Sequence, residues 1–261
     1  MLLDINAYVG HWPFKQLKYN TCASLVDRMD QFGVDVSVIS SLHGVFYKNT
    51  QSANEKLYKE IRSERRFDNR LIPFAIINPI YAGWKNDFEV SIEKMGMQGI
   101  RLYPLYHDYD LTVPACIQLV KMARDRGLPV AFSARIVDSR QRSWMDLNVE
   151  WTLEDIMPVI REVPDAKYWI LNVANSTRLS IADIDLLKTT DLLFDTSGRS
   201  MNDLPDLLTI YGKNKFAFGT HSPILDYLTG LLRIEALREN EINEEGKEQI
   251  RSENAKRMLG L

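Results

Sequence analysis

The residues best suited to chemistry begin almost at the start of the chain, in the segment LLDINAY (2–8). Apolar residues alternate there with Asp4, Asn6 and Tyr8, and a period of two predicts a strand with all three polar side chains on one face. Buried polar groups cost free energy unless they are hydrogen-bonded, so these side chains must pair with one another or with a ligand. We expect Asp4 to be a structural hydrogen-bond acceptor and Asn6 and Tyr8 to be site residues.

Histidine changes its charge near neutral pH, and the four histidines of this chain each follow a predicted strand. They are His11, His43, His107 and His221. A neutral imidazole at such a place can serve as a base or as a metal ligand. We expect His221 to be catalytic and His43 to contact a substrate. His11 and His107 stand beside aromatic residues, where stacking without catalysis is the commoner outcome.

Other polar residues lie where further predicted strands end. They are Ser41, Asn78, Arg101, Tyr103, Ser133, Arg135, Asn172, Asn175, Asp195 and Ser197. A strand that leaves a core meets water, so one such residue alone is weak evidence for a site. For Arg135 the structural alternative is a salt bridge to Asp138 or Asp195. Aromatic residues also collect in these loops and could stack on a sugar or ring; they are Trp12, Phe14, Tyr103, Tyr106, Tyr109, Trp144 and Trp151.

Eight short apolar runs rich in β-branched and aromatic residues are predicted strands. They are LLDINAY (2–8), VSVISSL (36–42), LIPFAIIN (71–78), QGIRLYP (98–104), PVAFSAR (129–135), YWILNVAN (168–175), LLFDTSG (192–198) and KFAFGTH (215–221). Between them, apolar residues at three- and four-residue spacing predict helices, several of which end at Gly or Pro. Eight strands that alternate with helices predict an α/β fold, the (β/α)8 TIM barrel, whose chemistry lies at the C-terminal ends of the strands.

An open doubly wound sheet is the alternative fold, but it calls for a Gly-rich phosphate turn after the first strand. The first turn of this chain is VGHWPFK (9–15), which has one Gly followed by bulky residues. We therefore favour the barrel. No linker or low-complexity tract divides the sequence, and we expect a single barrel domain over residues 1–261.

The composition excludes several classes of function. The chain has 261 residues, of which 45% are hydrophobic and 26% charged, and its net charge is −3 with no basic block. We therefore expect no nucleic-acid partner and no membrane partner, because no surface attracts a phosphate backbone and no segment is long and apolar enough to span a bilayer. A signal-peptide pattern is missing from the start of the sequence, so we expect a cytoplasmic protein. Cys22 and Cys116 lie far apart in helical patterns and are predicted to be buried thiols.

With these residues placed, the sequence resembles the amidohydrolase-related family of metal-dependent TIM-barrel hydrolases and decarboxylases. The resemblance covers almost the whole chain and rests on six segments in the expected order. They are MDQFGVDVSVIS (29–40), GIRLYP (99–104), RGLPVAFSA (126–134), LLFDTSG (192–198), FAFGTHSP (216–223) and ENAKRMLGL (253–261). The resemblance implies a barrel fold and a hydrolase.

The same resemblance places the family's catalytic metal at positions that have changed in this chain. The family's first strand carries D-x-H-x-H-x-x-G, whose two histidines bind the metal, and Asn6 and Tyr8 stand at those positions. The remaining ligand positions hold Ser133 or Arg135, Asn172 or Val173, and, in place of an aspartate that is both ligand and base, His221. Asn amides and a protonated Tyr bind Zn²⁺ poorly. We therefore expect no metal at this site, with a divalent metal such as zinc as the less favoured alternative.

These substitutions predict a hydrolase that acts on a small ester, lactone or amide with little or no metal. The resemblance assigns Arg101, Tyr103 and Arg135 to a carboxylate or a developing oxyanion, which a guanidinium can grip with two donors. The expected catalytic residues are His221, Tyr8 and Asn6. The expected substrate-binding residues are Arg101, Tyr103, Arg135, Asn172, Trp12 and His43.

Two other interpretations of the sequence stay open. The first is a non-catalytic ligand-binding protein of the same fold, which a deep pocket without a water site beside the imidazole would favour. The second is a protein that binds a metal through His11, His43 and His221 instead of the family's ligand positions. The long segment DSRQRSWMDLNVEW (138–151) could cover the mouth of the barrel, or pack against a second copy of the chain in a homodimer.

Overall fold

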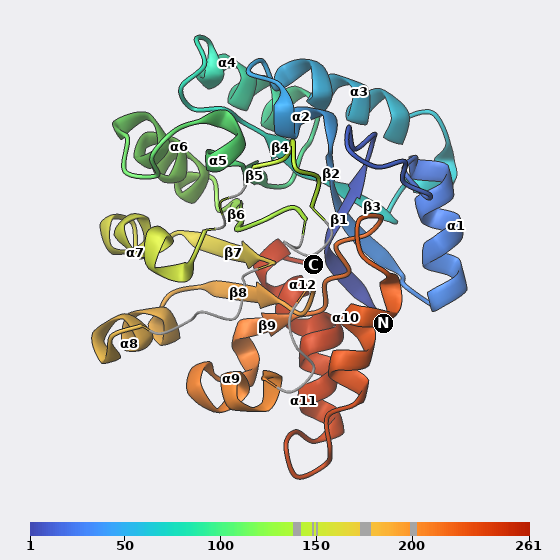
Figure 1. Ribbon diagram of the computed structural model, residues 1–261, viewed down its shortest axis with the longest axis vertical. Coiled ribbons are helices and arrows are strands. Elements are labelled where there is room, and N and C mark those ends of the chain that lie inside the picture. Colours follow the sequence, from blue (N-terminus) through green and yellow to red (C-terminus); the bar gives the residue numbers. More distant parts are fainter. Residues whose placement is uncertain (138–141, 148, 150, 173–178, 199–202) are drawn as a thin grey trace.

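Strands lie at the centre of the computed structural model and helices surround them (Figure 1). The structure describes residues 1–137, 142–147, 149, 151–172, 179–198 and 203–261. Its strands are β1 (Leu3–Val9), β2 (Val36–Ser41), β3 (Leu71–Pro73), β4 (Ala75–Ile76), β5 (Ile100–Leu102), β6 (Pro129–Ser133), β7 (Lys167–Leu171), β8 (Leu192–Asp195) and β9 (Phe216–Ala217). Each predicted strand is present, although most are shorter than the sequence predicts.

The strands form a parallel barrel, as the sequence predicts. One sheet has the order β1-β2-β3 and the other β4-β5-β6-β7-β8-β9, and every pairing is parallel. At the junction of β3 and β4 the Phe74 amide donates to the Ile39 carbonyl at 2.9 Å. On the other side the Tyr8 amide donates to the Ser222 carbonyl at 2.8 Å, which joins β1 to the segment after β9. Hydrogen bonds therefore continue across both gaps, with β3 and β4 together in the place of one barrel strand.

Helices follow the strands and are fixed at their ends by local sequence. They are α1 (Cys22–Phe32), α2 (His43–Phe46), α3 (Gln51–Ile61), α4 (Trp84–Glu89), α5 (Pro104–His107), α6 (Pro114–Asp125), α7 (Leu153–Glu162), α8 (Ile181–Thr189), α9 (Leu204–Tyr211), α10 (Tyr227–Glu235), α11 (Glu244–Glu248) and α12 (Asn254–Leu259). For example, α1 begins where the Thr21 hydroxyl accepts a hydrogen bond from the Ser24 amide, and it ends at Gly33 with φ 64°. None of the described helices is long and apolar enough to cross a membrane.

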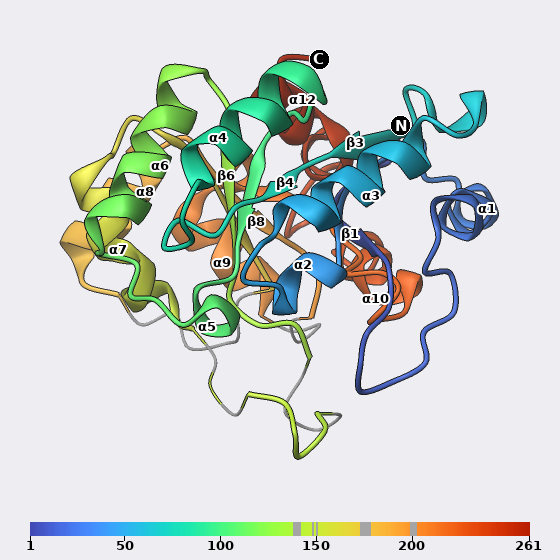
Figure 2. The ribbon, with the colours of Figure 1, turned by 90° about the horizontal axis from the view of Figure 1, so that it is seen from above.

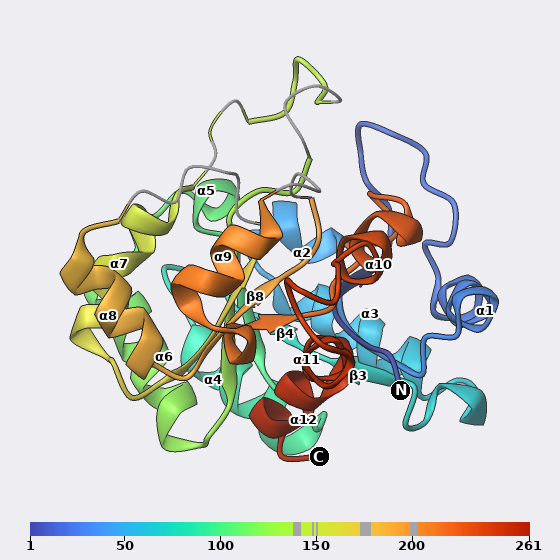
Figure 3. The ribbon, with the colours of Figure 1, turned by 90° about the horizontal axis from the view of Figure 1, so that it is seen from below.

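The lower part of the barrel lumen is apolar. Ile5, Trp169 and Leu193 come from strands on different sides of the barrel, and Phe74 comes from the junction of β3 and β4, so they can meet only inside the barrel. The Phe74 and Trp169 rings stack at 4.8 Å. Met258 of α12 belongs to the same cluster, so this last helix closes the lower end. Figures 2 and 3 show both chain termini near this end, whereas residues 10–20 after β1 and the described residues 142–147 after β6 project from the opposite end.

A second apolar layer lies between the strands and the helices. It includes Ala7 and Val9 of β1 and Leu25 of α1. Cys22 and Cys116 are buried in this layer as free thiols, which confirms the prediction for both.

An irregularity in β1 corrects the prediction for Asp4. The register of β1 against β2 shifts between Asp4 and Ala7, so the alternation of faces is interrupted there. Ile5 therefore faces the lumen and Ala7 the helices, and Asn6 and Tyr8 turn into the lumen without Asp4. The prediction that all three polar side chains share one face is wrong, because it assumed an unbroken period of two.

Asp4 is nevertheless the buried structural acceptor that the sequence predicts. Its carboxylate accepts hydrogen bonds from the backbone amides of Asn6 and Thr220 at 2.9 and 3.0 Å and from the Thr220 hydroxyl at 2.6 Å. Burial raises the pKa of Asp4 to about 6, although these hydrogen bonds act in the opposite direction. The carboxylate thus ties the start of β1 to the segment after β9.

Candidate functional site

The upper part of the lumen holds a connected group of polar side chains centred on Asn6. Its amide nitrogen lies 2.6 Å from a carboxylate oxygen of Asp195, 3.1 Å from the Ser197 hydroxyl and 3.1 Å from Nδ1 of His221. Its amide oxygen accepts a hydrogen bond from Arg101 at 2.6 Å. The orientation of this amide is therefore determined, because three acceptors surround its nitrogen and a cation stands at its oxygen.

Arg101 of β5 reaches across the lumen to β1. One of its Nη atoms donates both to Asn6 and to the Tyr8 hydroxyl, and its Nε donates to the Ser133 hydroxyl at 2.8 Å. The guanidinium also lies over the Tyr8 ring, 4.0 Å from its centre. Arg101 is only 2% exposed, and within the described residues no carboxylate pairs with it directly. Asp195 balances this charge indirectly, because the Asn6 amide lies between the two side chains and hydrogen-bonds to both.

His221 lies fully buried against Asn6 and Tyr8. Its Nε2 is 2.6 Å from the Ile136 carbonyl, which can only accept, so Nε2 carries the proton and Nδ1 accepts from Asn6. Burial, with the charges of Arg101 and Arg135 as smaller causes, lowers the pKa of His221 to about 3. The imidazole is therefore neutral near pH 7, and both of its nitrogens are engaged.

Asp195 and Ser197 complete the group, and the sequence analysis did not assign them to the site. The Ser197 hydroxyl donates to the Asp195 carboxylate, which also accepts from the backbone N–H of Asn172 at 2.6 Å. The signal for both was present in the FDTSG segment, where both lie at the end of a predicted strand. Sequence spacing cannot show that their partner is Asn6, which lies 189 residues away from Asp195.

Arg135 and Asn172 lie above this group. Arg135 donates from Nε to the Asn172 side-chain oxygen at 3.2 Å and from an Nη to the Gly198 carbonyl at 2.7 Å. Asp138, one of the acids that the sequence offered as a partner for Arg135, lies outside the described residues, as do Val173 and Asn175. Arg135 therefore helps to hold the loops after β6, β7 and β8 together.

Tyr103 adds a hydroxyl that has no hydrogen-bond partner in the part of the chain that the structure describes. The ring is 1% exposed, and its centre is 5.7 Å from the Arg101 guanidinium. Tyr103 and Ser133 line a cavity of about 10 Å³, which is roughly the space one water molecule needs. Burial raises the pKa values of Tyr103 and Tyr8, so both phenols keep their protons.

Among the described residues, neither Trp12 nor His43 makes a side-chain hydrogen bond to the group around Asn6, although Trp12 belongs to the same apolar cluster as Tyr8 and Tyr103. Trp12 packs in an aromatic cluster with Phe46 and Tyr106, at ring distances of 5.1 and 6.2 Å. His43 Nε2 accepts from the His11 backbone amide at 3.3 Å, and the two imidazoles are 5.7 Å apart.

The proposed metal site of His11, His43 and His221 is not formed. Among the described residues, no three His, Cys, Asp or Glu side chains gather closely enough to hold a metal ion. Nδ1 of His221 is occupied by Asn6 and its Nε2 by a carbonyl. That interpretation is wrong for the described part of the chain.

Neither a family model nor a curated protein matches this sequence, but solved structures share its fold. Similar structures include 2,6-dihydroxybenzoate decarboxylase from Rhizobium, with a TM-score of 0.76, 13% identity, and coverage of 99% of this chain and 98% of that one. Dihydroxybenzoic acid decarboxylase from Polaromonas, with bound manganese and the inhibitor 2-nitroresorcinol, gives a TM-score of 0.73, 13% identity, and coverage of 100% and 97%. An amidohydrolase II gives 0.73 at 15% identity over 100% of both chains. The chain therefore has the TIM-barrel fold of amidohydrolase-superfamily enzymes.

A protein of this fold binds manganese. Whether a metal can also bind in this chain depends on the side chains at the corresponding position. The resemblance places the metal between Asn6, Tyr8 and His221. Here the Asn6 oxygen and the Tyr8 hydroxyl both face the Arg101 guanidinium, and no nitrogen of His221 is free to coordinate. A cation already stands beside these groups, and a second one would be repelled. The described residues do not fit a divalent metal at this position.

Proposed function

We propose that the upper lumen binds a small anionic molecule of the carboxylate class, and that binding rather than turnover is its activity. One observation carries this proposal: Arg101 is a buried guanidinium with no directly paired carboxylate among the described residues. A buried charge without a partner is costly, so an anion beside it would be stabilised. Within the described residues the second Nη of Arg101 has no hydrogen-bond acceptor, and the Tyr103 hydroxyl offers a further donor.

The environment of His221 supports binding over hydrolysis. A general base needs a free lone pair within hydrogen-bond reach of the attacking water and a pKa near the working pH. Nδ1 of His221 faces the Asn6 amide, Nε2 donates to the Ile136 carbonyl, and burial lowers its pKa to about 3. The imidazole therefore orients Asn6 and leaves no place for water.

The size of the cavity limits the ligand. A space of about 10 Å³ accepts a molecule no larger than water, and Tyr103, Ser133 and Arg135 line it but Arg101 does not. Formate or acetate therefore reaches the Arg101 guanidinium only when side chains at the cavity wall move. Leu147 and Val149 line the outer side of this cavity and are themselves partly exposed. A small carboxylate could thus displace them at little cost to the core.

Tyr103→Phe tests the proposal without endangering the fold. The variant should bind formate or acetate about tenfold more weakly than the wild type in an NMR titration, because one hydrogen-bond donor is lost. Its stability should stay the same or rise, since a buried hydroxyl without a partner is removed. Tyr109→Phe is the matched control, because its hydroxyl is also buried and has no partner among the described residues, but it lies in the outer apolar layer. Equal affinities in wild type and Tyr103→Phe, or no binding of either carboxylate, would refute the proposal.

A metal-independent hydrolase for a small ester, lactone or amide is the second candidate. The free Nη of Arg101 and the Tyr103 hydroxyl form the kind of donor pair that stabilises a developing oxyanion. This candidate needs a base other than His221. Turnover of a lactone or ester panel that Arg101→Met abolishes and Tyr103→Phe lowers would favour it, whereas carboxylate binding without any turnover favours the first candidate.

A further inference from the structure

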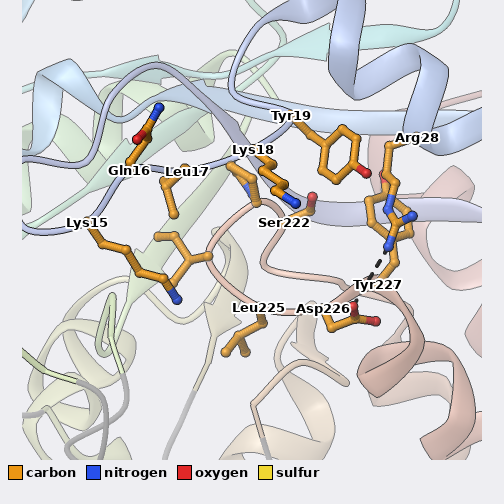
Figure 4. Close-up of a pocket in the computed structure, with 12 residues that line it drawn as sticks. Lys15, Gln16, Leu17, Lys18, Tyr19, Arg28, Ser222, Leu225, Asp226 and Tyr227 are labelled. Atoms are coloured by element: carbon orange, nitrogen blue, oxygen red, sulfur yellow. Dashed lines mark ion pairs between the residues drawn. The ribbon is translucent and has the colours of Figure 1, made fainter.

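A separate pocket lies on the rim of the barrel, between the loop after β1 and the loop after β9 (Figure 4). Its volume is about 280 Å³, near the lower end of the range for small-molecule sites. Residues 15–19 form one wall, residues 222–227 form another, and Arg28 of α1 closes one side. Because Ser222 directly follows His221, the rim pocket adjoins the lumen site but uses different side chains.

Both walls of the rim pocket are fixed to β1. The Gly10 amide donates to the Asn20 carbonyl at 2.6 Å, which closes the first loop, and the Tyr8 amide donates to the Ser222 carbonyl at 2.8 Å. Leu17 is buried among the aromatic residues of the barrel mouth. The pocket is thus formed before any ligand arrives, which lowers the ordering cost of binding.

Positive charge dominates the lining. The described lining holds Lys15, Lys18 and Arg28 but a single acid, Asp226. Within the described residues neither lysine amine makes a hydrogen bond or an ion pair. The excess of two positive charges is notable in a chain whose net charge is −3. Two unpaired amines beside a pocket attract an anion.

Aromatic rings, rather than acidic side chains, hold the Arg28 guanidinium in place. Its guanidinium lies over the Tyr19 ring at 4.9 Å and the Phe32 ring at 4.4 Å, and one Nη donates to Gln31 at 2.9 Å. Asp226 is 3.7 Å away, which is longer than a hydrogen bond. The planar donor edge of Arg28 is therefore oriented but only weakly paired, and it suits an oxyanion.

We propose that the rim pocket binds a phosphate dianion, either free or as the monoester of a small molecule. A phosphate carries close to two negative charges and three acceptor oxygens. The lining offers it the Arg28 guanidinium, with Lys18 on the same side of the pocket and Lys15 toward the other end (Figure 4). TIM barrels often bind phosphate in the loops after their last strands, and residues 222–227 follow β9, the last strand of this barrel. Leu17, Ile224 and Leu225 give the pocket an apolar side for an organic group.

Calorimetric titration of the full chain at low salt tests this proposal with two probes, inorganic phosphate and glycerol phosphate. One saturable site is expected. Lys15→Ala and Lys18→Ala should each weaken binding about threefold to tenfold, as expected for one partly exposed charge contact. Lys188→Ala is the control, because that exposed lysine lies on α8, outside the pocket lining.

Asp226→Asn should act in the opposite direction and tighten phosphate binding about threefold, because it removes the one acid in the lining. Asn still caps α10, so the fold is preserved. Tighter binding of the monoester than of inorganic phosphate identifies a phosphorylated molecule as the ligand, and equal affinities identify the free ion. No saturable binding of either probe, affinities unchanged in both lysine variants, or tighter binding of a phosphate-free acidic peptide would overturn the proposal. None of these outcomes depends on Arg101 or Tyr103.

Discussion

Nη of Arg101 lies 2.6 Å from the amide oxygen of Asn6, at the strand position where the resemblance places a metal-binding histidine. The nitrogen of the same amide lies 2.6 Å from Asp195. A neutral amide thus stands between a buried cation and a buried carboxylate, donating to one and accepting from the other. This arrangement keeps two charges in the lumen without direct contact and leaves part of the guanidinium available to a third group.

Removing the guanidinium should destabilise the protein strongly. Arg101→Met leaves Asp195 without its compensating charge and removes the donors that bind Asn6, Tyr8 and Ser133. We expect the free energy of unfolding, measured by urea titration, to fall by about 3 kcal/mol. Arg126→Met, which removes a partly exposed Arg paired with Glu89, should cost less than about 1 kcal/mol.

A rescue experiment at position 101 checks whether the guanidinium has a specific place in the lumen. Arg101→Ala leaves a space bounded by the acceptors of Asn6, Tyr8 and Ser133. Millimolar ethylguanidinium should raise the melting temperature of this variant and leave that of Arg126→Ala unchanged. If both variants respond alike, the guanidinium has no specific place in the lumen.

Divalent metals should leave the stability of the protein unchanged. Melting temperatures with EDTA, with zinc and with manganese are expected to agree within about 1 °C, because binding to the native state alone would raise them. The physical reason is the Arg101 charge beside Asn6 and Tyr8. One equivalent of tightly bound zinc or manganese in the purified protein, lost in Asn6→Ala, would contradict this expectation.

The barrel and the meeting of its first and last strands could be predicted from the sequence. Period-two and helical spacing are local signals, and closure of eight strands brings β1 beside the segment that carries His221. The contact between Asn6 and His221 follows from that adjacency. Short helices such as α2 and α5 were not predicted, since a few residues inside a loop are too short for a helical period.

The missed features depend on contacts distant in sequence. The irregularity after Asp4 arises where that carboxylate accepts from the Asn6 and Thr220 amides, and no periodic pattern announces it. The state of His221 depends on the Ile136 carbonyl, a backbone group that any residue type supplies. His221 was predicted as a base from its residue type, its place after the last strand and the resemblance, none of which shows that both of its nitrogens are engaged or that burial lowers its pKa.

Burial gives Asp4 and His221 opposite effects on the pH dependence of stability. The pKa of His221 falls from 6.5 to about 3 on folding, so its contribution is complete above pH 6.5 and is lost as the pH falls toward 3. The pKa of Asp4 rises from 3.8 to about 6, so its contribution is complete below pH 3.8 and is lost as the pH rises through 6. Between about pH 4 and 6 the two effects nearly cancel.

Single-residue variants should separate the contribution of His221 from that of Asp4. Relative to His221→Asn, the wild type should lose about 2 kcal/mol of unfolding free energy as the pH falls from 6.5 to 4.5. Relative to Asp4→Asn, it should lose about 2 kcal/mol as the pH rises from 4.5 to 7. Asn suits position 221, where φ is 58°, and it can still accept hydrogen bonds at position 4. Urea unfolding of the three proteins across this range measures both slopes. Parallel curves for wild type and His221→Asn would mean that the imidazole protonates in the folded protein, and the lumen would then be open to water.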